Sequence, residues 1–339
     1  LLPFKTVQSN GDHGYDVTQI VTGVKVGEPI AASIFHVPAS TQIQTQAPVS
    51  VPIAERQGHY FASVSIRGHD YEFLIDTGAQ GVVVDSRVAA ELVLIPKGRL
   101  EVSGATRTGG LGIAELGSIG IGGATLPMRV VSVLDLNSAT GGGLPIDGIL
   151  GYPFFAAAEV RIDPDRLTMT IGKPGSLAPL GTKFDVDVDR ERAEIHASVN
   201  RVSANFVVDT GDSSELLIFS PFLREHPGFV PFEDRPLISS FGVGGSMRAL
   251  AATIDELDLG PFHLYNRRAA LIQATSGAFA DRFDAGNIGM ETLQNFVSTF
   301  DLADDALYLE RGARYDDGRD RSVTGNSTLT VPSYLPNTL

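Results

Sequence analysis

The sequence carries the triplet Asp-Thr-Gly twice, and each copy follows an apolar run typical of a buried strand. The first copy lies in FLIDTGAQGVVV around Asp76, and the second lies in FVVDTGDSSELLI around Asp209. Asp, Thr and Gly are all tolerated in turns, so one triplet alone is compatible with an ordinary strand end. Two copies with matching flanks constrain the fold far more, because they place two carboxylates at equivalent points of two related units.

A second pair of matching segments follows the triplets. IDGILGYPFFAAAEVRID occupies Ile146–Asp163, and GNIGMETLQNFVSTFD occupies Gly286–Asp301. Each contains a glycine, a short helical stretch and a strand that ends in Asp. The interval from Gly151 to the final Asp of the first segment equals that from Gly289 to the final Asp of the second. The repeated pattern indicates that the chain is an internal duplication.

These motifs resemble those of the aspartic peptidases. Each half is similar to a retropepsin-type unit, and the pair is similar to a compact, single-chain pepsin, over about residues 49–310. The resemblance implies an all-β, bilobal acid protease fold with two pseudo-twofold-related β-barrel lobes and short helices. It also implies that Asp76 and Asp209 meet at the pseudo-twofold axis as a catalytic dyad. Because both halves lie in one chain, we expect a monomer.

The other residues of the triplets suit a carboxylate pair. Gly78 and Gly211 let main-chain N–H donors approach the carboxylates closely. Thr77 and Thr210 are β-branched strand residues, and the resemblance implies that their hydroxyls reach across to the opposite loop. Two carboxylates about 3 Å apart repel by roughly 5 kcal/mol at an effective dielectric of about 20, so they share one proton. The ionised partner can then act as a general base toward water.

Each half also contains a Gly-bearing hairpin, expected over Glu101–Leu116 and Ser239–Ile254. The resemblance identifies these hairpins as flaps over an extended peptide, which would be held mainly by main-chain hydrogen bonds. Neither hairpin contains the tyrosine usual in a pepsin flap, and a plain surface hairpin is the alternative. We expect substrate to be bound beside the two aspartates and in the flaps, by Ala79, Asp212, Ser213, Gly104, Thr106, Gly109, Gly110, Gly242, Gly244 and Gly245.

Asp212 directly follows the second triplet, where the first half has Ala79. Aspartic peptidases commonly carry Ser, Thr or Ala at this point, so an acid is a departure. One interpretation is that its carboxylate faces solvent or caps a neighbouring turn. The other is that a third acid raises the pKa values of the dyad and favours a basic side chain in the adjoining pocket. Both interpretations stay open.

Composition disfavours several other classes of function. The 339 residues contain no cysteine, which excludes disulfides, thiolate catalysis and thiol-ligated metals. The formal charge of −14 disfavours nucleic acid and anionic membranes as partners, and no apolar stretch is long enough to span a bilayer. Asp185, Asp187 and Asp189 alternate with valines, which fits the solvated face of a strand better than a calcium site. We expect a polypeptide substrate, no metal and no cofactor.

The segments outside the duplication complete the domain organisation. We expect an N-terminal β segment with its linker, two protease lobes and a tail, over 1–48, 49–176, 177–314 and 315–339. Thr41–Pro52 has the composition of a linker. The first segment resembles the end of an exported domain that often precedes tandem aspartic peptidases in bacteria, which implies an upstream signal peptide and a periplasmic or secreted location. Alternatively it forms a strand pair that covers the first lobe through Ile20, Val24 and Phe35.

The main hypothesis is therefore an aspartic endopeptidase that uses water and needs no cofactor. The alternative is a catalytically silent peptide-binding module with the same cleft. The two triplets favour the enzyme because both are intact, whereas a duplicated fold that has lost activity normally shows a damaged triplet.

Overall fold

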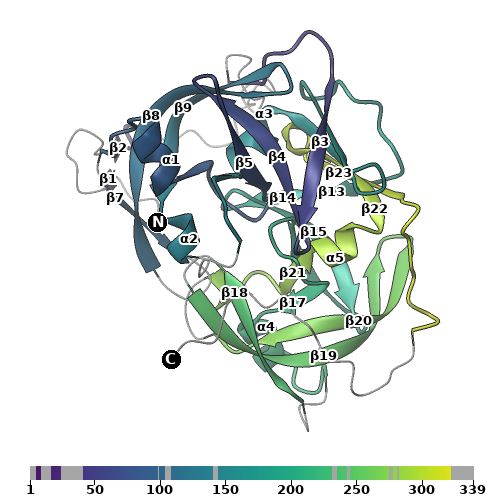
Figure 1. Cartoon of the computed structure of the whole chain (residues 1–339). Helices are drawn as coiled ribbons and strands as arrows, with labels where there is room; N and C mark the ends of the chain where they lie inside the picture. Colours follow the sequence, from purple (N-terminus) through teal and green to yellow (C-terminus); the bar gives the residue numbers. More distant parts are fainter. Residues whose placement is uncertain are drawn as a thin grey trace.

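The computed structural model describes residues 5–8, 17–23, 41–97, 99–103, 108–139, 144–230, 235–242, 245–274, 278–280 and 282–321. Strands account for 52% of the structure and helices for 12%. Figure 1 shows two lobes, one above the other, with the first half of the chain in the upper lobe. The all-β, bilobal protease fold predicted from the motifs is confirmed. Among the described residues, no helix has the length and apolar character needed to cross a membrane.

Six strands of the first lobe close into a barrel, in the order β4 (His59–Ile66), β5 (His69–Ile75), β10 (Gly148–Leu150), β6 (Val83–Asp85), β9 (Ala124–Leu134) and β8 (Thr108–Ile121). The pairing of Ser65 with Gly120 joins β4 to β8 and closes the circuit. Tyr60, Val64 and Ile66 alternate along β4 and are buried, which is the pattern of a strand with one face on a core. The lobe also contains β7 (Arg99–Ser103), α1 (Ser86–Glu91), α2 (Leu136–Ala139) and α3 (Tyr152–Ala157).

The second lobe repeats this arrangement. Its strands are paired in the order β15 (Arg192–Val199), β16 (Val202–Asp209), β21 (Gly286–Gly289), β17 (Leu216–Ile218), β20 (Phe262–Ile272) and β19 (Gly245–Leu259). A further pairing of β15 with β19, at Ser198 and Asp258, joins the two ends of this order. The lobe also contains β14 (Asp187–Asp189), β18 (Leu237–Gly242), α4 (Ser220–Glu225), α5 (Met290–Leu293) and the 3-10 turns Ala278–Ala280 and Leu302–Asp304.

The two halves are joined by a shared sheet. Its strands lie in the order β13 (Thr182–Asp185), β23 (Ala306–Arg311), β22 (Phe296–Asp301), β11 (Glu159–Asp163), β12 (Thr168–Gly172) and β3 (Val49–Arg56). The central pairing is antiparallel, with Val160 opposite Phe300 and Ile162 opposite Ser298. The strands that pair here are the duplicated ones, so equivalent segments of the two halves lie side by side.

The strand that ends in each triplet has the same neighbours in both lobes. β5 pairs in parallel with β10, which pairs antiparallel with β6. β16 pairs in the same way with β21, which pairs antiparallel with β17. The glycine of each downstream motif therefore stands beside an Asp-Thr-Gly, which explains why these two distant segments recur together in the sequence.

The segment before β3 differs from the expected linker. Ile43 is 1% exposed, and its N–H donates to Ala157 O at 2.9 Å. Gln44 bridges to Thr125 of β9, and β3 already begins at Val49. The prediction of a linker over Thr41–Pro52 is thus wrong for much of this stretch, because Ile43 and Val51 are buried against the first lobe.

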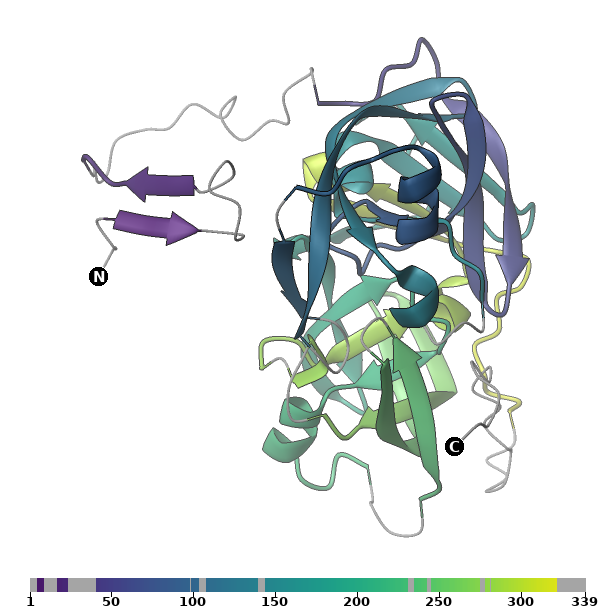
Figure 2. The same ribbon diagram turned by 60° about the vertical axis from the view of Figure 1, so that its left-hand side comes forward.

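The N-terminal strands β1 (Lys5–Gln8) and β2 (Val17–Ile20) form a sheet of their own. Figure 2 shows this hairpin apart from the two lobes. Ile20 is 63% exposed and does not cover the first lobe. Val24 and Phe35, which were expected to share that role, lie outside the described residues.

The chain from Gly312 to Arg321, called here the C-terminal strap, returns over the second lobe. Tyr315 packs edge-on against Phe296 and near Phe262, with ring centroids 5.6 and 6.4 Å away. The first part of the expected tail is thus bound to the lobe by an aromatic anchor and several charged groups. Residues 322–339 lie outside the described ranges.

Candidate active site

The two Asp-Thr-Gly segments meet through their threonines. The loops are called here the first Asp loop (Asp76–Gln80) and the second Asp loop (Asp209–Ser213). Thr77 N donates to Thr210 Oγ1 and Thr210 N donates to Thr77 Oγ1, both at 3.0 Å. The hydroxyls then donate onward to main-chain carbonyls of the opposite lobe, Thr77 to Val208 O at 2.6 Å and Thr210 to Ile75 O at 2.9 Å. Because both threonines are buried, this cycle joins the lobes without competition from water.

The glycines of the triplets leave room for the opposite carboxylate. A Cβ added to Gly78 would lie 2.5 Å from Asp209 Cγ, and one added to Gly211 would lie even closer to Asp76 Cγ. Any side chain at either position would therefore collide with the dyad. The same contacts show that the structure brings Asp76 and Asp209 together across the interface of the lobes.

The carboxyl groups of Asp76 and Asp209 are hydrogen-bonded to each other, and their environments raise both pKa values. Burial raises the pKa of Asp76 to about 6, against the opposing effect of main-chain donors from Gly78 and Ala79. Burial, then the charge of Asp76 and then that of Asp212 raise the pKa of Asp209 well above its ordinary value. Two groups held in this way titrate as a pair, and the raised pKa values mean that the pair keeps a proton above the pH range in which an isolated Asp ionises.

A buried amide also reaches the dyad. Asn287, on β21, is 3% exposed, and its Nδ2 donates to Asp209 Oδ2 at 2.6 Å. Asp209 Oδ1 accepts from Gly211 N at 3.0 Å. Both oxygens of Asp209 are therefore occupied by donors from its own lobe.

Asp212 caps a turn and also affects the pKa values of the dyad, whereas the preference for a basic side chain in the adjoining pocket stays a prediction. Its Oδ1 accepts from Ser214 N at 2.9 Å and from Ser214 Oγ at 2.7 Å, so the carboxylate caps the turn of the second Asp loop. Its charge also raises the pKa values of Asp76 and Asp209, while burial raises its own. Turn capping and electrostatic coupling to the dyad coexist because one short side chain reaches both.

Each lobe sends the tip of a hairpin to the Asp loop of the other lobe. In the first lobe, Gly58 adopts φ +78°, and a Cβ there would lie 3.1 Å from Ser213 Cβ. The next residue, His59, is hydrogen-bonded to the main chain of Gly211, and burial lowers its pKa to about 4. In the second lobe, Arg190 O accepts from Gln80 Nε2 at 2.6 Å. Each Asp loop is therefore in contact with a hairpin of the opposite lobe.

The glycines of the downstream motifs pack closely against the main chain of the Asp loops. A Cβ on Gly151 would lie 2.5 Å from Ala79 O, and one on Gly289 would lie 2.9 Å from Asp212 O. The same two carbonyls accept main-chain N–H groups at the starts of α3 and α5, from Tyr152 at 2.8 Å and from Met290 at 2.6 Å. Ala79 and Asp212 thus occupy equivalent positions in the two loops.

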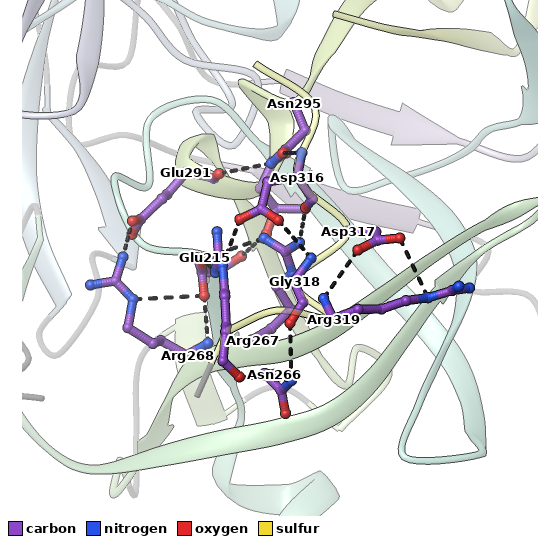
Figure 3. Close-up of polar contacts among 12 residues, drawn as sticks. Glu215, Asn266, Arg267, Arg268, Glu291, Asn295, Asp316, Asp317, Gly318 and Arg319 are labelled. Carbon is purple, nitrogen blue, oxygen red and sulfur yellow. Dashed lines mark hydrogen bonds and ion pairs between the residues drawn. The ribbon is translucent and has the colours of Figure 1, made fainter. Parts of the chain in front are cut away.

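A charged cluster lies at the end of the second Asp loop. Glu215 has a fully buried side chain and forms ion pairs with Arg267 Nη1 at 3.5 Å and Arg321 Nη1 at 2.6 Å. Figure 3 shows Glu215 among Arg267 and Arg268 of β20, with Asp316 of the C-terminal strap close by. The Glu215 carbonyl also accepts from Gly289 N at 3.0 Å. The cluster ties the strap to the segment that follows Asp212.

The predicted flaps are hairpins in the structure. β7 pairs with β8 from Arg99 opposite Gly112 to Ser103 opposite Thr108, so Gly109 and Gly110 lie on β8. β18 pairs with β19 up to Gly242 opposite Gly245. Gly104, Thr106 and Gly244 lie outside the described residues. Whether both hairpins face the dyad stays a prediction.

Within the described ranges, one group of carboxylate and imidazole atoms comes close enough to share a metal ion. Glu256, Asp258 and His263 lie on β19 and β20 with ligand atoms within 4.8 Å of one another. His263 Nδ1 lies 2.5 Å from Asp258 Oδ1, and Arg201 Nε lies 3.9 Å from Glu256 Oε2, so salt bridges account for the group. The Asp185–Asp189 stretch forms no such group among these residues; Val186 is buried and its flanking aspartates are exposed, as the alternation predicted.

Sequence reasoning missed Asn287, His59 and Glu215. Asn287 carried a usable signal, since it interrupts an apolar motif where the first half has Ile149. His59 and Glu215 carried none, because their partners come from distant parts of the chain.

Comparison with known proteins supports the class that the fold and the paired carboxyls define. Residues 62–154 match a family model described as aspartyl protease. The matched segment contains the first Asp loop, β7 and β8, and it ends before Asp209. No curated protein matches the chain. The match supports an aspartic-peptidase-like family and a peptidase-like function.

Proposed function

We propose that the chain is an aspartic endopeptidase in which Asp76 and Asp209 activate water. The observation that carries the proposal is the meeting of two buried, mutually hydrogen-bonded carboxyls with raised pKa values, positioned by the cycle of Thr77 and Thr210. Such a pair holds one proton and one negative charge between its two pKa values, which is the state that general acid–base hydrolysis requires.

The chemistry follows from that shared proton. The ionised carboxylate takes a proton from a water molecule, and the water oxygen forms a bond to the carbonyl carbon of the peptide. The protonated carboxyl donates a hydrogen bond to the carbonyl oxygen as negative charge develops there. When the C–N bond breaks, the leaving nitrogen takes a proton from the dyad, and the pair returns to its initial state. No metal or cofactor takes part in these steps.

Substrate binding is proposed along the two hairpins. An extended peptide between the dyad and the hairpins β7–β8 and β18–β19 would be held by main-chain hydrogen bonds, and Ala79, Asp212 and Ser213 would contact it beside the aspartates. A structure with a bound peptide-like inhibitor tests this. Either hairpin packed against the back of its own lobe in that complex contradicts the flap assignment.

The decisive assay is cleavage of a peptide library at acid pH, with pepstatin as inhibitor control. Asp76→Asn and Asp209→Asn should each abolish turnover while leaving the unfolding transition intact, because either change removes one member of the proton-sharing pair. Substantial turnover by either variant would refute the dyad. Saturable peptide binding without cleavage by the unmodified chain would favour the silent binding module instead.

We further propose that the protein acts as a monomer and is exported to the periplasm or secreted from a bacterial cell. The joining of both halves in one chain supports the first point, since the dyad is complete without a second copy. Sedimentation at assay concentration and fractionation of the native host test the two points separately.

A further inference from the structure

The two members of the dyad have different hydrogen-bond donors, although duplicated loops carry them. Asp76 Oδ1 accepts from two main-chain N–H groups of its own loop, at 2.9 and 3.0 Å. Asp209 Oδ1 accepts from one, at 3.0 Å, and its Oδ2 accepts from Asn287 Nδ2 at 2.6 Å. Asp209 therefore has a side-chain amide in place of one main-chain donor.

The sheet register shows that the first lobe has no counterpart of this amide. Asn287 pairs with Val207, two residues before Asp209 on β16. The equivalent residue of β10 is Ile149, which pairs with Leu74, two residues before Asp76 on β5. An isoleucine side chain has no hydrogen-bond donor, so the asymmetry between the lobes comes from a single sequence difference, Asn287 against Ile149.

Asn287 also interacts with the third acid. Burial raises the pKa of Asp212, and Ser214 and then the nearby Asn287 amide lower it. Asp212 Oδ2 is itself buried and accepts no hydrogen bond from the described residues. The Asn287 amide thus donates to Asp209 at the place where the second Asp loop has an extra carboxylate and the first has only Ala79.

We propose that Asn287 is a positioning residue for Asp209 that makes the two members of the dyad chemically unequal. Its amide donates to the Asp209 carboxyl and stabilises the ionised form of that carboxyl next to a third acid, Asp212. The inference deepens the proposed peptidase function and rests on it for the kinetic test, whereas the stability test below needs no activity.

The other charged groups around Asn287 come from several elements: Asp76 after β5, His59 on β4, Glu194 and Arg192 on β15, and Asp284 before β21. Glu194 lies in the same row as Asn287, across β16. Burial and the adjacent Asp284 raise the pKa of Glu194 to about 8, so it stays neutral in the acid range. Asp284 is paired with Arg192 at 2.6 Å. Burial lowers the pKa of His59 to about 4, and none of the variants replaces this residue.

The kinetic test compares Asn287→Leu, a substitution of similar size without donors, in the unmodified chain and in Asp212→Ala. Loss of a donor to a carboxylate disfavours ionisation, so both limbs of the pH profile of kcat/KM should move to higher pH, by about one unit. In the Asp212→Ala background a shift should remain, because Asn287 donates to Asp209 directly. Asn287→Asp, which keeps the side-chain shape, should shift the limbs in the same direction.

The matched control is Asn295→Leu. Asn295 is also a buried amide, 4% exposed, but its Nδ2 donates to Thr292 O at 2.9 Å and to Glu291 O at 3.3 Å, on α5. This control should lower the unfolding midpoint and leave both limbs in place. Unmoved limbs in Asn287→Leu, or loss of the shift in the Asp212→Ala background, overturn the positioning role.

A stability test separates this inference from the peptidase function. A carboxyl whose pKa rises further in the folded state destabilises the fold as pH rises through that pKa. Asn287→Leu should therefore lower the unfolding midpoint more at pH 7 than at pH 4, whereas Asn295→Leu should lower it equally at both. If the unmodified chain fails to cleave peptides and this difference holds, the function is wrong and the role of Asn287 stands. An equal loss at both pH values overturns that role.

Discussion

Replacing Thr210 by valine tests the contact that joins the two Asp loops. The substitution keeps the shape and β-branching of the side chain and removes its hydroxyl. Thr210 Oγ1 accepts from Thr77 N at 3.0 Å and donates to Ile75 O at 2.9 Å, and the residue is 1% exposed. Both main-chain groups would lose their partner in a place that water cannot reach, at about 1–3 kcal/mol each. We expect the free energy of unfolding to fall by about 3 kcal/mol.

The measurement is urea unfolding of Thr210→Val, Thr77→Val and the double variant at one pH. The two hydroxyls belong to one hydrogen-bonded cycle, so the double variant should lose less than the sum of the single losses, by about 1 kcal/mol. The control is Thr168→Val, a strand threonine of β12 for which the described residues provide no side-chain hydrogen bond. It should change stability by less than about 0.5 kcal/mol. The reasoning is refuted if Thr210→Val behaves like this control, or if the two single losses add.

Three further outcomes are expected. Asp212→Ala should move the activity optimum toward acid and weaken any preference for Lys or Arg near the cut, because the Asp212 charge raises the pKa values of the dyad. If the pH–rate profiles overlap and the cleavage-site preferences are unchanged, Asp212 acts only as a turn residue. Arg321→Met should lower the thermal midpoint and reduce the free energy of unfolding by about 1 kcal/mol, because it removes a partly exposed and screened partner of the buried Glu215. An unchanged midpoint would contradict the conclusion that Arg321 helps to bind the strap to the lobe. Deletion of residues 1–40 should leave cleavage of a short peptide unchanged, and loss of activity in a folded truncation would show that this segment serves catalysis.

The sequence by itself determined the repeat, and with it most of the fold. Apolar runs that end in Asp-Thr-Gly predict strands whose ends carry a carboxylate, and the matching glycines downstream predict two copies of one unit. These are local patterns, so they can be recognised in a single sequence. Gly78 and Gly211 were predicted on physical grounds that the structure reproduces, since each faces the opposite carboxyl group. The linker prediction at Thr41–Pro52 was wrong because composition averages over Ile43 and Val51, which are both buried in the core.

Only the tertiary structure decided which side chains complete the site. Asn287 lies 78 positions beyond Asp209, and no periodicity connects them; they meet because β21 runs parallel to β16. His59 reaches Gly211 because one lobe docks against the other, and Arg321 reaches Glu215 because the strap turns back over the second lobe. Strand patterns reflect the burial of neighbours along the chain. The partner of a buried polar group depends on which distant backbone segment the fold brings beside it, and that is decided only when the lobes are assembled.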